Sequence, residues 1–173
     1  MIDADSGDEI RVLLDRPGWD AYPAWVPNGL KLTFTSDWRA YDILYDLYIV
    51  NADGTNVRPL LEGPFFWVDG QTFYFQSAWS PDTQRFAVVL CEYAWDNCYP
   101  SSSIAVADAD GTGLRIVARA GGYSRPAWSR DGRTIAFSSA ECRECQPALR
   151  FVRLDGSDEG LLVPNGHSPA WRP

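Results

Sequence analysis

The 173-residue sequence predicts an all-β protein built from a repeated four-stranded unit. A segment centred on tryptophan occurs four times, with its tryptophans 54, 49 and 43 residues apart, and it alternates with a turn segment centred on aspartate. No window of ten or more residues has a clear helical period, whereas many short segments alternate apolar and polar residues as strands do. Two motifs in a constant order at a similar period indicate a structural repeat. They are marked by Trp25, Trp79, Trp128 and Trp171, and by Asp5, Asp53, Asp110 and Asp155.

The unit at 123–163 displays the predicted strand plan. A Ser-Arg-Asp-Gly turn joins its first two strands and an Asp-Gly turn joins its last two, because glycine supplies the positive φ that tight hairpins need. A loop with two cysteines separates the middle strands. Four short antiparallel strands in each such repeat are typical of a β-propeller blade. The predicted strands are residues 123–128, 133–138, 148–154 and 159–163.

The repeat divides the chain into three complete blades and a split fourth blade, all within one β-propeller domain or propeller segment. Three arrangements follow from this count. The chain is a piece of a longer propeller, or it closes on itself as a four-bladed ring, or two chains pair head to tail as a homodimer that shares blades. The single domain is 1–173, with complete blades at 21–61, 74–118 and 123–163, the last two strands of the split blade within 1–20 and its first strand at 167–173.

Two of the motif copies resemble a known repeat. Pro126–Gly132 reads PAWSRDG and Ala109–Thr112 reads ADGT, and together they resemble the TolB-type, WD40-like propeller repeat. The resemblance covers essentially the whole chain and implies a propeller fold. It implies no single function, because such repeats occur in periplasmic and secreted binding proteins and as accessory domains of some peptidases. The copies depart from the pattern where Val26 follows the first tryptophan and where Thr83 stands in place of glycine.

Charge and hydropathy exclude two classes of partner. The chain has 15 basic and 23 acidic residues, a net charge of -8, and no basic cluster, which argues against nucleic-acid binding. No apolar run approaches the roughly 18 residues that a membrane span requires, so we expect no membrane insertion.

The longer loops are predicted to gather on one face. In a blade, the loop between the second and third strands and the connection to the next blade lie on the same side, and these segments hold acidic and aromatic residues. Such a face suits a protein or peptide partner, most naturally a basic one, or a sugar ring. The alternative is that these aromatics cap the blade cores, as the four repeated tryptophans are expected to do. The candidate binding residues are Trp19, Trp38, Tyr41, Trp67, Tyr93 and Trp95.

The four cysteines are predicted to staple two loops. Cys91 and Cys98 bracket the loop between the second and third strands of one blade, and Cys142 and Cys145 lie in the equivalent loop of the next. Two local disulfides would place the protein in an extracellular or periplasmic compartment. A four-cysteine zinc site and a redox-active Cys-x-x-Cys remain as alternatives, and we predict no metal.

Residues for catalysis are sparse. His167 is the only histidine, and a lone loop histidine is usually structural. We therefore expect no catalytic residue and no cofactor, and we predict a non-catalytic binding or scaffold module. The alternatives are an accessory propeller domain of a hydrolase or peptidase and a carbohydrate-binding propeller.

Overall fold

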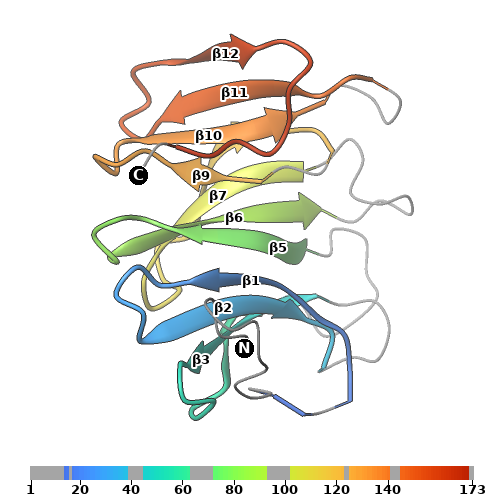
Figure 1. Cartoon of the computed structure of the whole chain (residues 1–173). Helices are drawn as coiled ribbons and strands as arrows, with labels where there is room; N and C mark the ends of the chain where they lie inside the picture. Colours follow the sequence, from blue (N-terminus) through green and yellow to red (C-terminus); the bar gives the residue numbers. More distant parts are fainter. Residues whose placement is uncertain are drawn as a thin grey trace, which may run out of the picture.

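A computed structural model describes residues 14–15, 17–38, 45–62, 72–92, 102–122, 125–140 and 145–171. Twelve strands form three four-stranded antiparallel sheets, and within each sheet every strand pairs with its neighbours in the sequence (Figure 1). The predicted all-β fold of four-stranded blades is confirmed. Within the described ranges, no helix is long and apolar enough to cross a membrane.

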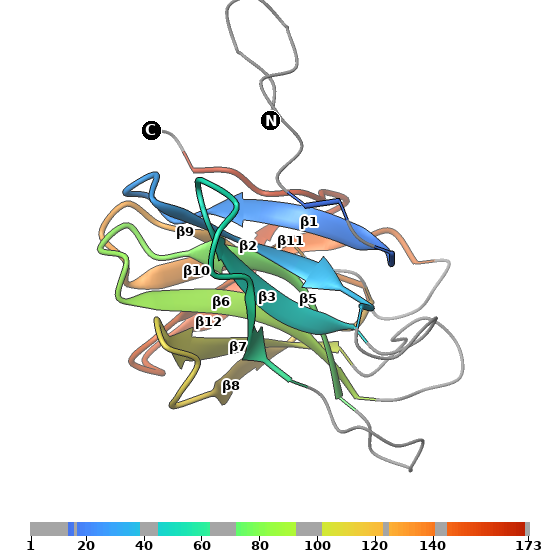
Figure 2. The same ribbon diagram turned by 90° about the horizontal axis from the view of Figure 1, so that it is seen from below.

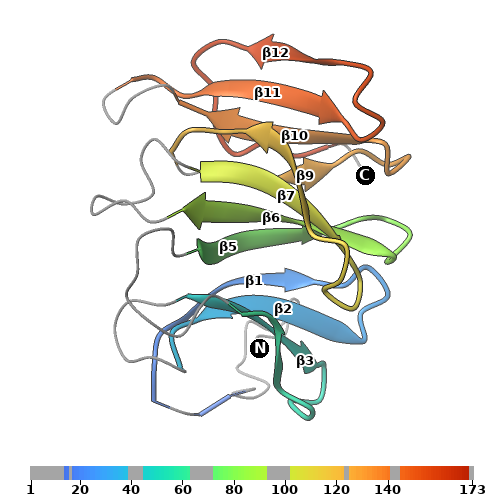
Figure 3. The same ribbon diagram turned by 180° about the vertical axis from the view of Figure 1, so that it is seen from behind.

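The three sheets follow one another along an arc, as the view from behind makes clear (Figure 3). Hairpins within the blades gather at the left of Figure 1, and the strand ends that lead to the predicted long loops lie at the opposite side. The first blade contains β1 (Asp20–Trp25), β2 (Lys31–Ser36), β3 (Asp46–Asn51) and β4 (Arg58–Leu61). The second contains β5 (Thr72–Trp79), β6 (Arg85–Glu92), β7 (Ser102–Asp108) and β8 (Arg115–Arg119). The third contains β9 (Ala127–Trp128), β10 (Thr134–Ser139), β11 (Ala148–Arg153) and β12 (Glu159–Val163).

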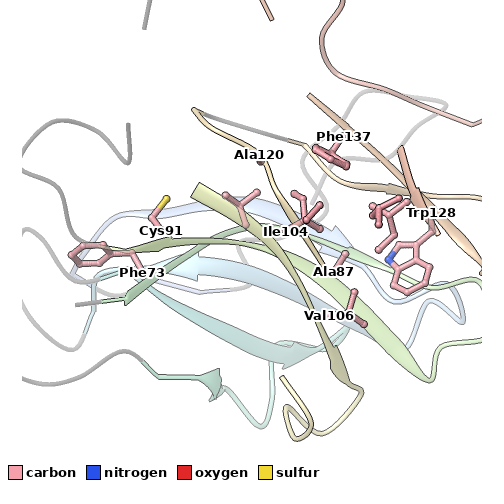
Figure 4. Packing of buried hydrophobic residues seen from close by; sticks show 12 residues of the cluster. Phe73, Ala87, Cys91, Ile104, Val106, Ala120, Trp128 and Phe137 are labelled. Carbon is pink, nitrogen blue, oxygen red and sulfur yellow. The ribbon is translucent and has the colours of Figure 1, made fainter. Parts of the chain in front are cut away.

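The core lies between the blades because successive side chains of a strand point to opposite faces of its sheet. In β6, Phe86 and Val88 belong to the apolar cluster shared with the first blade, whereas Ala87 and Val89 belong to the cluster shared with the third. Figure 4 shows the cluster between the second and third blades, where Trp128 and Phe137 of the third blade approach side chains of the second blade. A middle blade is therefore apolar on both faces and needs a blade on each side.

The first strand of each blade, strand A, carries a tryptophan that reaches into the blade before it. The indole N–H of Trp79 donates to the hydroxyl of Thr33 at 3.1 Å, and that hydroxyl donates to the carbonyl of Ala24 at 3.3 Å. The indole N–H of Trp128 donates directly to the carbonyl of Ala78 at 2.8 Å. These indoles fill the space between two strands A and also satisfy their one polar group.

The expectation that all four repeated tryptophans are core is wrong for two of them. Trp79 and Trp128 are 8% and 7% exposed, but Trp25 and Trp171 are 48% and 42% exposed. The physical reason is position along the arc. No described blade precedes Trp25, and Trp171 lies beyond the last complete sheet, so each lacks a neighbour on one side.

The repeated turns owe their Ser-x-Asp and Asp-x-Thr pattern to hydroxyl–carboxylate hydrogen bonds. Ser80 Oγ donates to Asp82 Oδ1 at 2.6 Å, and Ser129 Oγ donates to Asp131 Oδ1 at 2.6 Å. These bonds, together with nearby backbone N–H groups, hold the pKa of both carboxyls below the ordinary value of 3.8. Asp110 accepts the same kind of bond from the following threonine, and its pKa is lowered for that reason.

The described residues do not test the predicted split blade. Residues 167–171 contain no strand, and a strand forms only where a second strand pairs with it. The partner strands expected at residues 1–4 and 9–14 lie outside the described ranges, apart from Leu14. The split blade stays a prediction.

The Trp79–Thr33 contact should couple the first two blades. In a double-mutant cycle with Trp79→Phe and Thr33→Val, we expect a coupling free energy of about 0.5–1.5 kcal/mol, the net contribution of one buried hydrogen bond. Denaturant unfolding of the four proteins measures it. Strictly additive losses of stability would show that the indole contributes only its apolar surface.

The turn aspartates should make the fold sensitive to acid. Their pKa values are lower in the folded chain than the ordinary 3.8, so their stabilisation is complete above that pH and is lost as the pH falls through the folded values. We expect the unfolding free energy to fall between pH 5 and about pH 3, and to fall less in the Asp82→Asn/Asp131→Asn variant. Urea titrations at several pH values test this; an equal fall in both proteins would contradict it.

Candidate functional site

An aromatic cluster lies where the first blade meets the second, at the end of β1 that faces the predicted long loops. The ring of Trp19 meets Tyr22 edge-on at 5.7 Å and Tyr45 at 5.3 Å between centroids. Tyr45 in turn lies 5.0 Å from Phe75 of β5, and Tyr22 lies 6.5 Å from the same ring. Edge-to-face pairs at these distances stabilise one another beyond simple burial. We call Trp19, Tyr22, Tyr45 and Phe75 the aromatic cluster.

A carboxylate fixes the backbone that carries Trp19. Asp37 Oδ1 accepts the Trp19 N–H at 2.6 Å, and the Asp37 N–H donates to the Trp19 carbonyl at 3.3 Å. Gly18 makes this approach feasible: its φ is +123°, and a Cβ there would stand 2.9 Å from Asp37 Oδ1. The segment before β1 is thus held against the end of β2.

The backbone of β1 bends beneath the cluster. The β1–β2 register shifts between Ala21 and Ala24, and Tyr22 within that bulge has a φ of +53°. A bulge redirects the side chain it carries. Here it accompanies the turn of the Tyr22 ring toward Trp19 and Phe75, so a strand that begins at Asp20 supports an aromatic surface at its end.

Acidic groups underlie the same end of the blade. Register places Asp20, Ser36 and Asp46 opposite one another across β1, β2 and β3. Asp46 is fully buried, whereas Asp20 is exposed. Burial, followed by the nearby charge of Asp46, raises the pKa of Tyr74 above its ordinary 10.0. This end of the first blade therefore carries one exposed and one buried carboxyl group.

Trp38, the second predicted binding residue that the structure describes, packs elsewhere. Its ring lies 6.0 Å from Tyr48, which itself stacks on Phe34 on the side of the first blade away from the second. The backbones of Trp19 and Trp38 run close together, since a Cβ on Gly18 would lie 3.4 Å from the Trp38 Cα. Both rings are about half exposed, but they contact different partners.

Four of the predicted binding residues lie outside the described ranges, and three cluster members were missed. Tyr22, Tyr45 and Phe75 come from three separate segments, and only the approach of β5 to β1 brings them together. A weak signal was available for Tyr45, which ends the same predicted loop that holds Trp38. The undescribed residues are Tyr41, Trp67, Tyr93 and Trp95.

The cysteines are described only in part. Cys91 is buried at the end of β6, Cys145 is exposed before β11, and neither is a free thiol. Their expected partners, Cys98 and Cys142, lie outside the described residues, so the two pairings stay predictions. Among the described residues, no group of three histidine, cysteine, aspartate or glutamate side chains could hold a metal ion.

In the described part of the chain, the side chain of His167 has one polar contact, with the next residue. Its Nδ1 lies 3.2 Å from the hydroxyl of the adjacent Ser168, and both residues are exposed. A hydroxyl on the next residue is a neighbour of the ring rather than a nucleophile held for attack on a bound substrate.

Solved structures share this fold, although no protein-family model matches the sequence and no curated protein matches it either. TolB from Agrobacterium tumefaciens aligns with a TM-score of 0.66 and 18% identity over 93% of this chain and 53% of that chain. An oligogalacturonate lyase from Vibrio parahaemolyticus aligns with a TM-score of 0.66 and 19% identity over 96% of this chain and 42% of that chain. The β-propeller domain of the Trilobed protease from Pyrococcus furiosus aligns with a TM-score of 0.57 and 13% identity over 84% and 43% of the two chains.

These likenesses establish the fold and no activity. The chain spans about half the length, or less, of each of the three proteins. The names of these proteins include enzymes. At such low identity, a shared fold does not indicate a shared function. The TolB-type resemblance of the sequence therefore holds at the level of structure, and the chain is a β-propeller segment of three four-stranded blades.

Proposed function

We propose that the protein is a non-catalytic binding module that recognises a basic protein or peptide segment at the loop end of its first blade. The observation that carries this proposal is Trp19, which is 44% exposed although two rings and Asp37 fix its position. A large aromatic side chain that is already ordered loses little conformational entropy when a partner covers it. Preorganised tryptophans of this kind are typical anchors of protein interfaces.

The acidic surroundings of Trp19 give the proposal its charge preference. Asp15 and Asp20 are exposed on either side of it in the sequence, and the chain as a whole has a net charge of -8. A lysine or arginine side chain could lie along the indole face while its charge stays near a carboxylate. Complementary charge of this type speeds association and makes it weaken as salt rises.

The alternative classes rest on less. An accessory role beside a hydrolase would place the chemistry outside this chain, and the enzyme names among the similar structures describe those proteins alone. A sugar site would favour exposed indoles that share a plane, and the two described loop tryptophans pack against different partners. Both classes therefore serve as outcomes of the binding test.

Replacing Trp19 by alanine should abolish most of the binding. We expect the dissociation constant for lysine- and arginine-rich peptides to rise at least about thirtyfold, the loss typical of an interface hot spot, with little change in melting temperature. Fluorescence titration measures it, with Leu30→Ala as the control because Leu30 is 66% exposed in the β1–β2 hairpin at the opposite end.

The same titration separates the alternatives. Glutamate-rich peptides of matched length should bind at least tenfold more weakly, and raising the salt should slow association with the basic ones. Binding of neutral oligosaccharides but not of peptides would replace the proposal with a sugar site. Silence toward every probe from the intact chain would remove the first blade as the binding face.

We also propose that the cysteines form the two loop staples Cys91–Cys98 and Cys142–Cys145, and hence that the protein works in an extracellular or periplasmic compartment. Two disulfides should make the denatured, unreduced chain about 4 Da lighter than the reduced chain, one dalton per thiol hydrogen lost. Intact mass spectrometry before and after reduction measures this. Equal masses would contradict the staples and the compartment together.

A further inference from the structure

One contact between successive strands A recurs, and it extends past the last complete blade. The indole N–H of Trp128 donates to the carbonyl of Ala78, and the indole N–H of Trp171 donates to the carbonyl of Ala127 at 2.9 Å. In both cases the acceptor is the alanine just before the tryptophan of the preceding strand A. Trp79 reaches the equivalent carbonyl, that of Ala24, through the Thr33 hydroxyl. We call this the junction contact.

The segment before Trp171 also repeats the backbone of strand A. Tyr22 and Gln76, each three residues before a strand-A tryptophan, have φ values of +53° and +45°, and Ser168 has +54° at the same position. Positive φ is uncommon away from glycine, and three of the four residues at this position have it, Arg125 of the third blade being the exception. Residues 168–171 therefore have the shape and the contact of a strand A, and Ser168 is tied to the third blade through the Ser138 hydroxyl at 3.1 Å.

The third blade exposes a face that the other two blades bury. Val163 pairs with Leu149 on β11, as Leu61 pairs with Leu47 in the first blade. Val163 is 46% exposed, whereas Leu61 is 7% exposed. Leu161 and Leu162 on the same strand are also exposed. This apolar edge indicates a place where a further blade would pack.

At the opposite end of the arc, the described residues include no strand A before the first blade. Figure 2 looks onto this side of the first sheet, with β1, β2 and β3 in order across it. Phe34 and Tyr48 are buried there, and Leu14 packs against their cluster. Trp25, on the edge strand β1, is 48% exposed, six times the fraction of Trp79 at the same position in the second blade. On this face Phe34 and Tyr48 are therefore buried, whereas Trp25 has no strand A from the described residues packed against it.

We propose that the place beside Trp25 is filled by residues 168–171 of a second copy of the chain, with the Trp25 indole N–H donating to the Ala170 carbonyl of that copy. The two ends of one chain are complementary halves of the junction contact, which is the requirement for a head-to-tail interface. Within one copy the segment 168–171 does not cover Trp25, which stays 48% exposed. Two such junctions would join two copies of the chain head to tail.

The test is the mass of the assembly formed by the full chain. Native mass spectrometry and light scattering at micromolar concentration should find a dimer, twice the 19.4 kDa of one chain. Trp25→Ala should raise the dimer dissociation constant at least tenfold. Ile116→Ala, which removes a comparably exposed apolar side chain from the second blade, should leave it unchanged. A wild-type chain that stays monomeric, or a Trp25→Ala chain that still dimerises fully, would overturn the proposal.

A mixture of two variants tests the head-to-tail geometry and guards against misfolding of either one. Trp171→Ala should also weaken the dimer, because it loosens the segment that docks. When it is mixed with isotope-labelled Trp25→Ala, one junction combines the intact Trp25 of one copy with the intact segment 168–171 of the other. Mixed dimers should therefore exceed the share that random pairing of two equally weak variants would give. Equal weakness of mixed and self pairs, with both variants folded by circular dichroism, would exclude a head-to-tail contact.

Discussion

The structure depends on the packing of each blade against the blade before it. Both faces of the second sheet are apolar, so that sheet is stable only as a middle layer. The strand-A tryptophan joins the two requirements of that packing, because its ring fills the space between strands and its N–H satisfies a carbonyl of the preceding blade. The repeated tryptophan in the sequence corresponds to this contact. The Ser-x-Asp turns then hold the second strand of each blade in register with strand A.

The local sequence predicted the strands well because each strand has its own period-2 pattern and its own turn. It failed for Trp25 and Trp171, since exposure at those positions depends on what lies beside a blade rather than on the blade itself. The same limit applies to the aromatic cluster. Trp19 could be named from a loop position, but its contact with Tyr45 and the contact of Tyr45 with Phe75 require three distant segments to meet. No one-dimensional period encodes that meeting.

Backbone contacts, and not the aromatic rings alone, keep the candidate site rigid. Asp37 bonds the N–H of Trp19, Gly18 allows the close approach, and the bulge at Tyr22 directs a second ring to the first. The fully buried Asp46 lies at the same end of the blade, and after burial it is the second cause of the raised pKa of Tyr74 in the next blade. An exposed tryptophan on a free loop would offer the same area but would have to be ordered by the partner.

Strand β1 links the two surfaces that the structure leaves open. Trp19 stands just before its first residue and Trp25 is its last, and among the described strands β1 pairs only with β2. A strand at the edge of a sheet is restrained less than a central one, and its unpaired side invites another strand. A strand A docked on Trp25 would hold the Trp25 end of β1 in place. Asp37 already holds the segment at its other end, next to Asp20. Assembly and recognition would then act on opposite ends of one strand, so a partner at Trp19 need not displace the neighbouring copy.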